Sequence, residues 1–437
     1  MKTKLSILAA LLCAALVQAE YSLKLADDMQ LRLGGDIRAR YEGTTSGADQ
    51  RFINVRKNHQ HSTEYFRFRT RVYGALDIGE NITVNLRLGN RFQSYTTSPS
   101  RHNNAGAPWA FPDEVYVDAA NVVIRNILDE HLTLTIGRQD LFLGNGLLFS
   151  EGTPYDQGRS VYNDGITAVY DLENDKLTAF MFYDRYKDHS VFINDRNRDL
   201  REGDIFTAGI YYTHSFNDAA KFDVYYMYND VDDQHATPAA DRSLSLHTIG
   251  ARFFGTYPKF LDHSLEMASQ FGRDANGYHL SGTMADGRLN FHLCESSPLK
   301  PVLGLEFTHF RGDEHGGWYP LKTQCPLWGE ELIPTLIRGL WTNMNMGSIT
   351  MSVNVTEKCS LLFYTTDYYA DDKDAAFAGN AQTGGGRHIG LLAGAKAAYK
   401  INEYLSTEAY LSHFMPGSFF NNGRDSNWFR LEITAKF

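Results

Sequence analysis

Trp428-Phe-Arg-Leu-Glu-Ile-Thr-Ala-Lys-Phe437, the last segment of the chain, follows a strict period of two. Successive side chains of a β-strand point to opposite faces, so one face carries Phe429, Leu431, Ile433, Ala435 and Phe437. Arg, Glu, Thr and Lys side chains dominate the other face. A strand with one apolar and one charged face suits a wall between lipid and water.

The same period recurs along the chain and predicts about eighteen strands, an even number as in single-chain bacterial barrels. The expected strands start near Leu31, Tyr65, Ile82, Glu114, His131, Ile166, Lys176, Ile205, Phe222, Leu244, Ser264, His279, Val302, Met344, Leu361, His388, Leu405 and Trp428. Short turns such as 79–81 alternate with long polar loops such as 139–164. In such barrels the short turns face the periplasm and the long loops face outside. We therefore expect an all-β fold, a transmembrane antiparallel β-barrel.

The amino terminus predicts the same location. Lys2 and Lys4 precede an apolar run over 5–17, and Val17-Gln18-Ala19 offers small residues for cleavage. This pattern predicts a signal peptide over 1–19 and a barrel over 20–437. A soluble β-sandwich or propeller would also alternate, but it rarely combines long strands, a signal peptide and a terminal phenylalanine. We expect an integral protein of the bacterial outer membrane.

Basic side chains share one parity on three neighbouring expected strands. A charge on the lipid face costs about 2–4 kcal/mol at the membrane midplane, so these side chains must point into the lumen. The expected lumen-facing cations are Arg38, Arg40, Arg67, Arg69, Arg71, Arg87 and Arg91, and the wall continues through Lys396, Lys400, Arg430 and Lys436 near the carboxyl terminus. The last strand should pair with the first, which makes this wall continuous.

The basic wall departs from the composition of the whole chain, which has 42 Lys and Arg against 52 Asp and Glu. Arginine offers a planar fork that binds carboxylate or phosphate in pairs, and a ladder of such forks lets an anion pass from site to site. Alternatively, the arginines pair with Asp36, Glu64, Glu114 and Asp118 and stiffen the wall. The sequence is compatible with both interpretations.

One segment is more specific than composition. Thr135-Ile-Gly-Arg-Gln-Asp-Leu141, Gly144-Asn-Gly146, Gly158-Arg-Ser160 and Asp164-Gly165 follow one another in order. This series resembles the signature of the alginate export family of outer-membrane barrels. The resemblance implies passive movement of an acidic polysaccharide through an arginine-lined pore. By motif match, it implies that Arg138 and Arg159 are pore residues, with Gln139 and Asp164 beside them.

Two details depart from the family pattern. Strict alternation from Leu132 would send Arg138 into lipid, so we expect a bulge at Gly137 or an end of the strand to redirect it. The family's alginate exporter plugs its pore with a long periplasmic loop before the penultimate strand, whereas that connection is short here, at 402–404. Gating should then come from outer loops folded inward, and 96–112 and 139–164 are the candidates.

These patterns predict a passive channel for anionic substrates, such as an acidic, alginate-like oligo- or polysaccharide. The alternatives are a porin for small anions, and a receptor or structural barrel that does not conduct. We expect no enzymatic activity, cofactor or metal, since the histidines lack the spacing of metal ligands. The expected partners are outer-membrane lipid and lipopolysaccharide, an anionic carbohydrate or small anion, and periplasmic secretion components, but no nucleic acid.

Overall fold

The computed structural model describes residues 21–46, 63–95, 109–110, 112–128, 130–151, 163–195, 197, 203–234, 241, 243–294, 296–311, 317–322, 342–372, 384–420 and 425–437. The expected signal peptide, Arg159 and most of the loop 96–112 lie outside these residues. No helix within the described part of the chain has the length and apolar character needed to cross a membrane.

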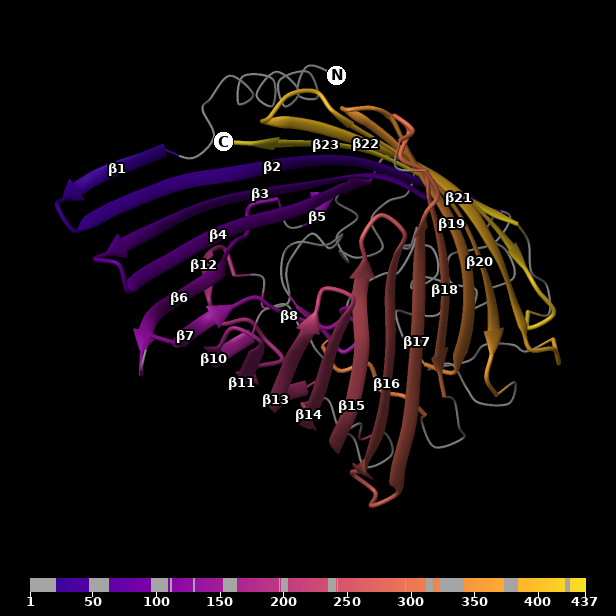
Figure 1. Ribbon diagram of the computed structural model, residues 1–437, viewed down its shortest axis with the longest axis horizontal. Coiled ribbons are helices and arrows are strands. Elements are labelled where there is room, and N and C mark those ends of the chain that lie inside the picture. Colours follow the sequence, from indigo (N-terminus) through magenta and orange to yellow (C-terminus); the bar gives the residue numbers. More distant parts are fainter. Residues whose placement is uncertain are drawn as a thin grey trace.

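The described residues form 23 strands, and 18 of them make a closed antiparallel circuit (Figure 1). The circuit runs through β2 (Met29–Ser46), β3 (Thr63–Ile78), β4 (Ile82–Tyr95), β6 (Val115–Ile127), β7 (Leu132–Gln139), β10 (Asn163–Asp171), β11 (Asp175–Asp184), β13 (Gly203–Asn217), β14 (Ala220–Asp233), β15 (Leu244–Tyr257), β16 (Leu261–Asp274), β17 (His279–His292), β18 (Val302–Phe310), β19 (Met344–Thr356), β20 (Cys359–Ala370), β21 (His388–Lys400), β22 (Leu405–Pro416) and β23 (Ser426–Lys436). The short strands outside the circuit are β1 (Tyr21–Ala26), β5 (Trp109–Ala110), β8 (Leu141–Leu143), β9 (Phe149–Glu151) and β12 (Val191–Ile193).

The predicted fold class, strand number and closure are confirmed. Every expected strand start lies within three residues of the start of a strand in the circuit. The last strand pairs with the first, from Asp36 opposite Lys436 to Ser46 opposite Ser426. Beyond this pairing, Gly35 and Phe437 exchange two backbone hydrogen bonds, at 2.7 and 3.0 Å. β1 then pairs with the start of β2, which places it in line with β23.

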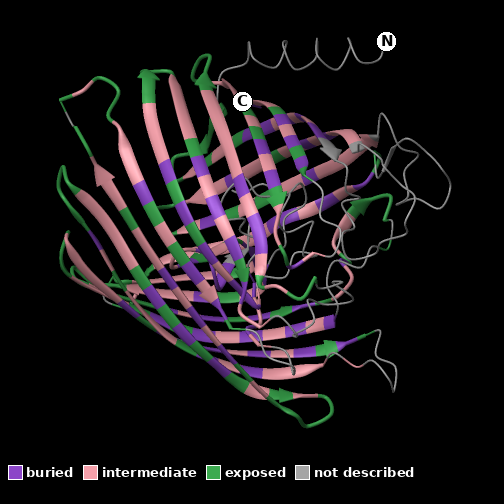
Figure 2. Ribbon diagram, turned by 90° about the vertical axis from the view of Figure 1, so that its right-hand side faces the viewer, coloured by how far each residue is buried: buried purple, intermediate pink, exposed green. Residues whose placement is uncertain are grey.

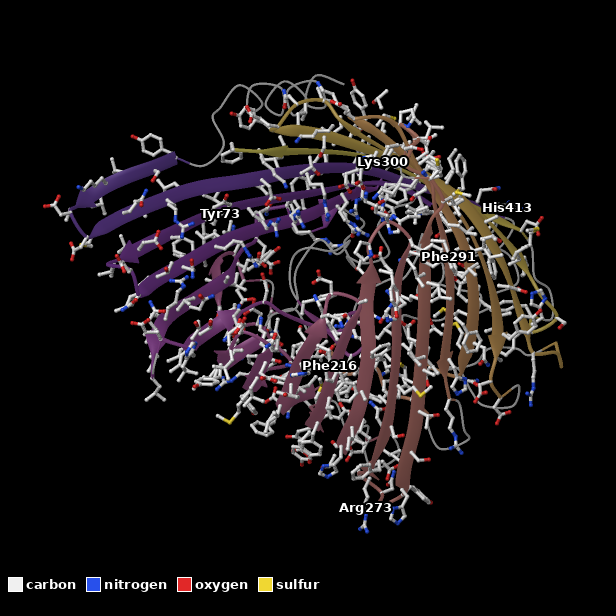
Figure 3. All side chains as sticks on the ribbon, in the orientation of Figure 1. Tyr73, Phe216, Arg273, Phe291, Lys300 and His413 are labelled. Carbon is white, nitrogen blue, oxygen red and sulfur yellow. The ribbon has the colours of Figure 1, made fainter. Side chains whose placement is uncertain are left out.

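Exposure alternates along the strands, as the banding in Figure 2 shows. Apolar side chains of one parity, such as Ile349 and Leu411, are 53% and 66% exposed. Their neighbours of the other parity are largely buried, and Arg40 is 2% exposed. Side chains cover both faces of the wall, and Figure 3 labels Lys300 and Arg273 at its opposite ends. The exposed apolar belt is therefore the lipid face, and the charged side chains face the lumen.

The wall has one irregular place, where β7 ends early. The chain leaves the wall after Gln139, so the upper part of β6 has no partner in β7. β12 occupies that edge through Val191 opposite Tyr116 and Ile193 opposite Val115. Backbone groups in lipid must be paired within the protein, so this patch satisfies the edge that β7 abandons.

The lipid face of β19 provides a direct test of the orientation of the strands. We expect Ile349→Arg to lower the free energy of unfolding by about 2–4 kcal/mol, because it places a charge in hydrocarbon. Ser352→Arg, on the lumen face of the same strand, is the matched control and should change stability little. Equilibrium unfolding by urea in lipid vesicles measures both. Equal losses in the two variants would contradict the assigned faces.

Candidate functional site

The expected basic side chains lie together on the lumen face of the closure region. We call Arg38, Arg40, Arg67, Arg69, Arg71, Arg87, Arg91, Lys396 and Arg430 the basic band. Strand register sets their neighbours: Arg38 lies opposite Arg69, and Arg69 lies opposite Arg91. Arg40 lies opposite Arg67 in the next lumen-facing row. Like charges directly opposite one another destabilise a sheet, so compensating groups are required.

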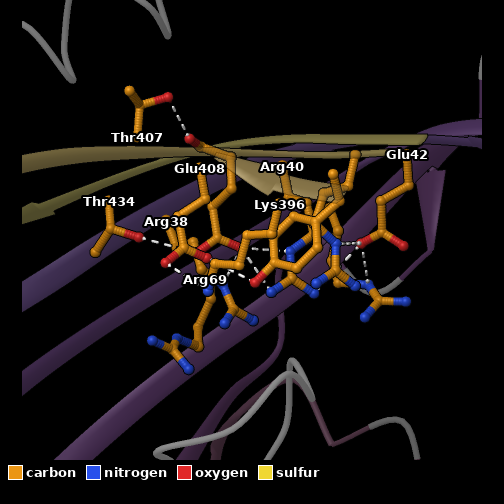
Figure 4. A network of polar contacts seen from close by, with 12 residues as sticks. Arg38, Arg40, Glu42, Arg69, Lys396, Thr407, Glu408 and Thr434 are labelled. Carbon is orange, nitrogen blue, oxygen red and sulfur yellow. Dashed lines mark hydrogen bonds and ion pairs between the residues drawn. The ribbon is translucent and has the colours of Figure 1, made fainter. Parts of the chain in front are cut away.

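Carboxylates on the same strands supply this compensation. Arg40 binds Glu432 at 2.6 Å and Glu42 at 3.3 Å (Figure 4). Asp36 accepts from Arg69 at 3.0 Å and from Arg71 at 2.6 Å. These contacts hold the guanidinium groups in fixed positions along the wall.

The network continues at longer distances and on the neighbouring strands. The remaining ion pairs of this network are Arg38–Glu432 at 3.9 Å, Arg67–Glu42 at 3.9 Å, Arg430–Glu42 at 3.7 Å and Lys396–Glu408 at 3.0 Å. Within the described residues, seven cationic side chains of this network thus share four carboxylates, Asp36, Glu42, Glu408 and Glu432. Arg87 pairs with two further carboxylates, Asp118 and Asp140. Among the described residues, the nine cations of the basic band therefore outnumber the six carboxylates paired with them, which leaves an excess of positive charge.

The sequence also raised the alternative that the arginines pair with nearby carboxylates, and two of the four expected carboxylates do form such pairs. Asp36 pairs with the band, and Asp118 binds Arg87 at 2.6 Å. Glu64 lies on the other face of the wall, where the Tyr41 hydroxyl donates to it at 2.8 Å. Glu114 is buried, and Asn90 Nδ2 donates to its backbone oxygen at 2.7 Å. No sequence pattern singles out Glu42, Glu408 and Glu432, because strand register decides which carboxylates reach the band.

Arg138, predicted from the family motif, lies where β7 leaves the wall. Its guanidinium binds Asp164 at 2.8 Å and Asp188 at 3.1 Å, and it donates to the backbone oxygen of Val117 at 2.8 Å. Gln139 Nε2 donates to backbone oxygens of β7 and β10. These contacts tie β6, β7, β10 and the segment before β12 together. The structure thus gives Arg138 and Gln139 a role in sealing the wall, and their role in a pore stays a prediction.

Gly137 has the unusual backbone conformation that accompanies the exit of β7 from the wall. Pairing with β10 continues through it without a shift in register, so the expected bulge is absent, and the strand instead ends at Gln139. Gly137 has φ 117°, which side chains rarely adopt, and a Cβ here would collide with the backbone oxygen of Ala120. Glycine is therefore required at this position.

The loop after β7 folds into the lumen, as expected for one of the two gating candidates. Strands β8 and β9 form a hairpin, and Figure 1 shows β8 inside the ring of strands. At the tip, Asn145 Nδ2 donates to Asp286 Oδ2 at 2.9 Å and to Ser264 Oγ at 3.0 Å. Arg252 donates to Asn145 Oδ1 at 3.0 Å. The hairpin therefore attaches to the lumen faces of β15, β16 and β17. The other candidate, 96–112, lies largely outside the described residues.

Apolar packing holds the rest of the hairpin in the barrel. Leu143, Leu147, Leu148 and Phe149 are buried in a cluster with lumen-facing aromatic and aliphatic side chains of β11 to β22. Positive φ angles at Gly144 and Gly146, 58° and 78°, allow the tight turn between β8 and this apolar run. Apolar side chains thus occupy part of the barrel interior on the side away from the basic band.

A second outer segment, 317–322, locks the hairpin. The Lys322 backbone N–H donates to the backbone oxygen of Leu148 at 2.9 Å. Its ammonium group is fully buried and pairs with Asp184, and it donates to Asn163 Oδ1 at 3.1 Å. Removing one partner of a buried ion pair costs about 3–5 kcal/mol, so this lysine is an anchor of the inner loops. The sequence around Lys322 gives no indication of this buried ion pair.

The base of the hairpin touches the basic band. Asp140 binds Arg87 at 2.8 Å, and Arg87 also holds Asp118. Burial raises the pKa of the Asp140 carboxyl, and the Arg87 guanidinium opposes that rise. The hairpin therefore connects the basic band to the opposite wall, where Arg252, Arg288, Asp223, Glu266, Asp286 and Glu306 lie close together.

The tip of the hairpin offers a test of whether it narrows the lumen. We expect Asn145→Ala to raise single-channel conductance and current noise, because the loop loses three hydrogen bonds, two of them to charged groups and worth roughly 1.5–3 kcal/mol each. Planar-bilayer recordings in symmetric salt measure this. Asn126→Ala, which removes an amide at the periplasmic end of β6, is the control. A conductance equal to that of the unmodified barrel would show that the hairpin tip does not restrict flow.

The chain matches a known protein family in sequence and several solved structures in fold. A family model described as Alginate export matches residues 29–432. The fold is similar to that of Pseudomonas aeruginosa OccK9 (OpdG), with TM-score 0.64 at 12% identity, covering 93% of this chain and 98% of that one. Pseudomonas aeruginosa OpdQ gives TM-score 0.60 at 10% identity, covering 93% and 97%. Acinetobacter baumannii OccAB4 gives 0.58 at 11%, covering 93% and 98%. No curated protein matches in sequence.

At these identities the structural likeness establishes the fold alone, whereas the family match covers almost the whole chain. The lipid-facing belt, the closed circuit and the family agree on the location. The protein therefore belongs to the alginate export family and is an 18-stranded β-barrel channel of the bacterial outer membrane.

Proposed function

We propose that the protein lets anionic solutes diffuse passively across the outer membrane along the basic band, and that its substrate is an acidic oligo- or polysaccharide. The single observation that carries this proposal is the surplus of cations over carboxylates in the band. A wall built only for stiffness would need balanced pairs, and would not place Arg38, Arg69 and Arg91 directly opposite one another.

The chemistry of the band suits a carboxylated sugar chain. A guanidinium that already shares a carboxylate can exchange it for a carboxylate of the solute, with two parallel hydrogen bonds in each case. Several such groups in succession bind a solute repeatedly and weakly, which permits release as well as entry. The sugar hydroxyls would meet tyrosines of the same region, such as Tyr65 and Tyr410, whose hydroxyls already donate to Glu42 and Glu408.

The inner loops support a narrower alternative. The β8–β9 hairpin and the segment around Lys322 place apolar side chains in the barrel interior, which leaves less room beside the band. A restricted passage favours small anions, such as organic acids, over a thick hydrated chain. Under this alternative the basic band has the same role and only the size limit of the solute changes. Outer-membrane lipid and lipopolysaccharide surround the barrel in either case.

Blockade by an oligouronate distinguishes these functions. The refolded barrel in a planar bilayer should carry an anion-selective current that tetragalacturonate interrupts at micromolar to millimolar concentration. Monomeric galacturonate that permeates without resolved blockade by the tetramer would favour the small-anion alternative. A barrel without current, or with cation selectivity, would contradict the proposal, and the loops would then carry the function.

Charge reversal in the band should change selectivity. We expect Arg67→Glu combined with Arg69→Glu to shift the reversal potential in a salt gradient from anion preference toward cation preference, since four units of charge change in the lumen. Arg67→Gln with Arg69→Gln should shift it in the same direction by less. Arg185→Glu with Arg273→Glu makes the same charge change near the outer ends of β11 and β16 and is the control. A reversal potential that follows the control would contradict a role of the band.

A further inference from the structure

A cavity lies at the periplasmic mouth, on the strands that also carry Lys396 and Arg430 of the basic band. Its volume is about 430 Å³, within the range of roughly 300–1,000 Å³ typical of sites for small molecules. It lies between the turn that connects β19 to β20, the turn that connects β21 to β22, and the end of β23. The charged residues that line it are Lys358, Lys400, Lys436, Glu357, Glu403 and Glu408.

Strand register shows that two of these lysines face the lumen. Lys400 lies opposite Ser406, which lies opposite Thr434, and Thr434 lies opposite Arg38 of the band. Lys436 lies opposite Asp36, the carboxylate shared by two arginines of the band. Residues directly opposite one another share a face, so both lysines extend the same wall to the periplasmic rim.

The two lysines differ from the arginines above them in their partners. Each cation of the ion-pair network has a carboxylate within 4 Å, as described above, but Lys400 and Lys436 make no ion pair with any residue in the described part of the chain. Both side chains are exposed. Lys358 Nζ donates to the backbone oxygen of Ile401 at 3.3 Å, which holds a third charge at the rim.

The three carboxylates that line the cavity in the described part of the chain do not pair with Lys400 and Lys436. Glu408 is paired with Lys396 at 3.0 Å and accepts from the Tyr410 hydroxyl at 2.9 Å. Glu357 and Glu403 lie in the two turns, at the margin of the mouth. They lower the total charge, so an anion would be held weakly, and weak holding is what entry into a conducting path requires.

We infer that this cavity is a loading site, in which Lys400 and Lys436 capture a carboxylate of an anionic sugar chain that approaches from the periplasm. This inference rests on the proposed function. The captured carboxylate would next meet Arg38, on the same row as Lys400, and then Lys396, two lumen-facing rows higher. Capture therefore delivers the solute to the lowest rows of the band, where Arg71 and Arg38 lie.

The test measures how often tetragalacturonate blocks single channels when it is added to either side. Exposed Cys294, in the periplasmic turn after β17, identifies the periplasmic side through an impermeant maleimide, with Cys325 and Cys359 replaced by serine. We expect Lys400→Gln with Lys436→Gln to lower the blocking frequency from the periplasmic side by about tenfold at low salt, as loss of electrostatic steering does. Blocking from the outer side should stay unchanged, and high salt should remove the difference.

The matched control is Lys176→Gln with Lys221→Gln. These lysines share the lumen parity of Thr178 and Asp223 and lie at the periplasmic ends of β11 and β14, on another arc of the rim (Figure 1). An equal loss in the control, or a loss from both sides, would overturn the loading site and leave the channel proposal intact. Absence of blockade in the unmodified protein from either side would overturn both the loading site and the acidic sugar chain as the substrate.

Discussion

Backbone hydrogen bonding between β2 and β23 is the constraint on which the rest of the structure depends. Hydrocarbon offers no partner for a free N–H or C=O, so a spanning sheet is stable only when its edges meet. Closure also builds the site, because Arg40 and Glu432 are 392 residues apart in sequence and become neighbours through this pairing. The membrane thus imposes the contact that assembles the network of charges.

The sequence predicts the strands, their number, their closure and the face of each arginine in the basic band. These features follow from a period of two and from the cost of a charge in lipid, and both can be read locally. Local sequence patterns did not predict where the β8–β9 hairpin attaches inside the barrel. Gly144-Asn-Gly146 indicates a turn, but its contacts with Arg252 and Asp286 join segments without a shared pattern. Strand register also decides which carboxylates reach the band. Glu64 lies opposite Gly43, one residue from Glu42, so Glu42 faces the lumen and Glu64 faces the outside of the barrel wall.

Ion pairing in the basic band reconciles stability with conduction. Unpaired guanidinium groups this close would repel one another, whereas full neutralisation would leave nothing for an anion to bind. Shared carboxylates such as Asp36 and Glu42 give an intermediate state, in which each arginine has a fixed position and incomplete compensation.

Strand tilt gives the row from Lys400 through Thr434, Arg38 and Arg69 to Arg91 a direction in space. Lys400 ends β21 at the periplasmic rim, whereas Arg91 lies in the outer half of β4, so the row climbs as it passes around the barrel. A solute that follows these charges turns about the axis while it rises, as along a screw thread. A flexible polymer can follow that thread by bending, whereas a stiff helical chain fits it only when the two have the same hand. On the proposed path, the row of charges would therefore favour a stiff chain whose twist matches its own over a chain of the opposite twist.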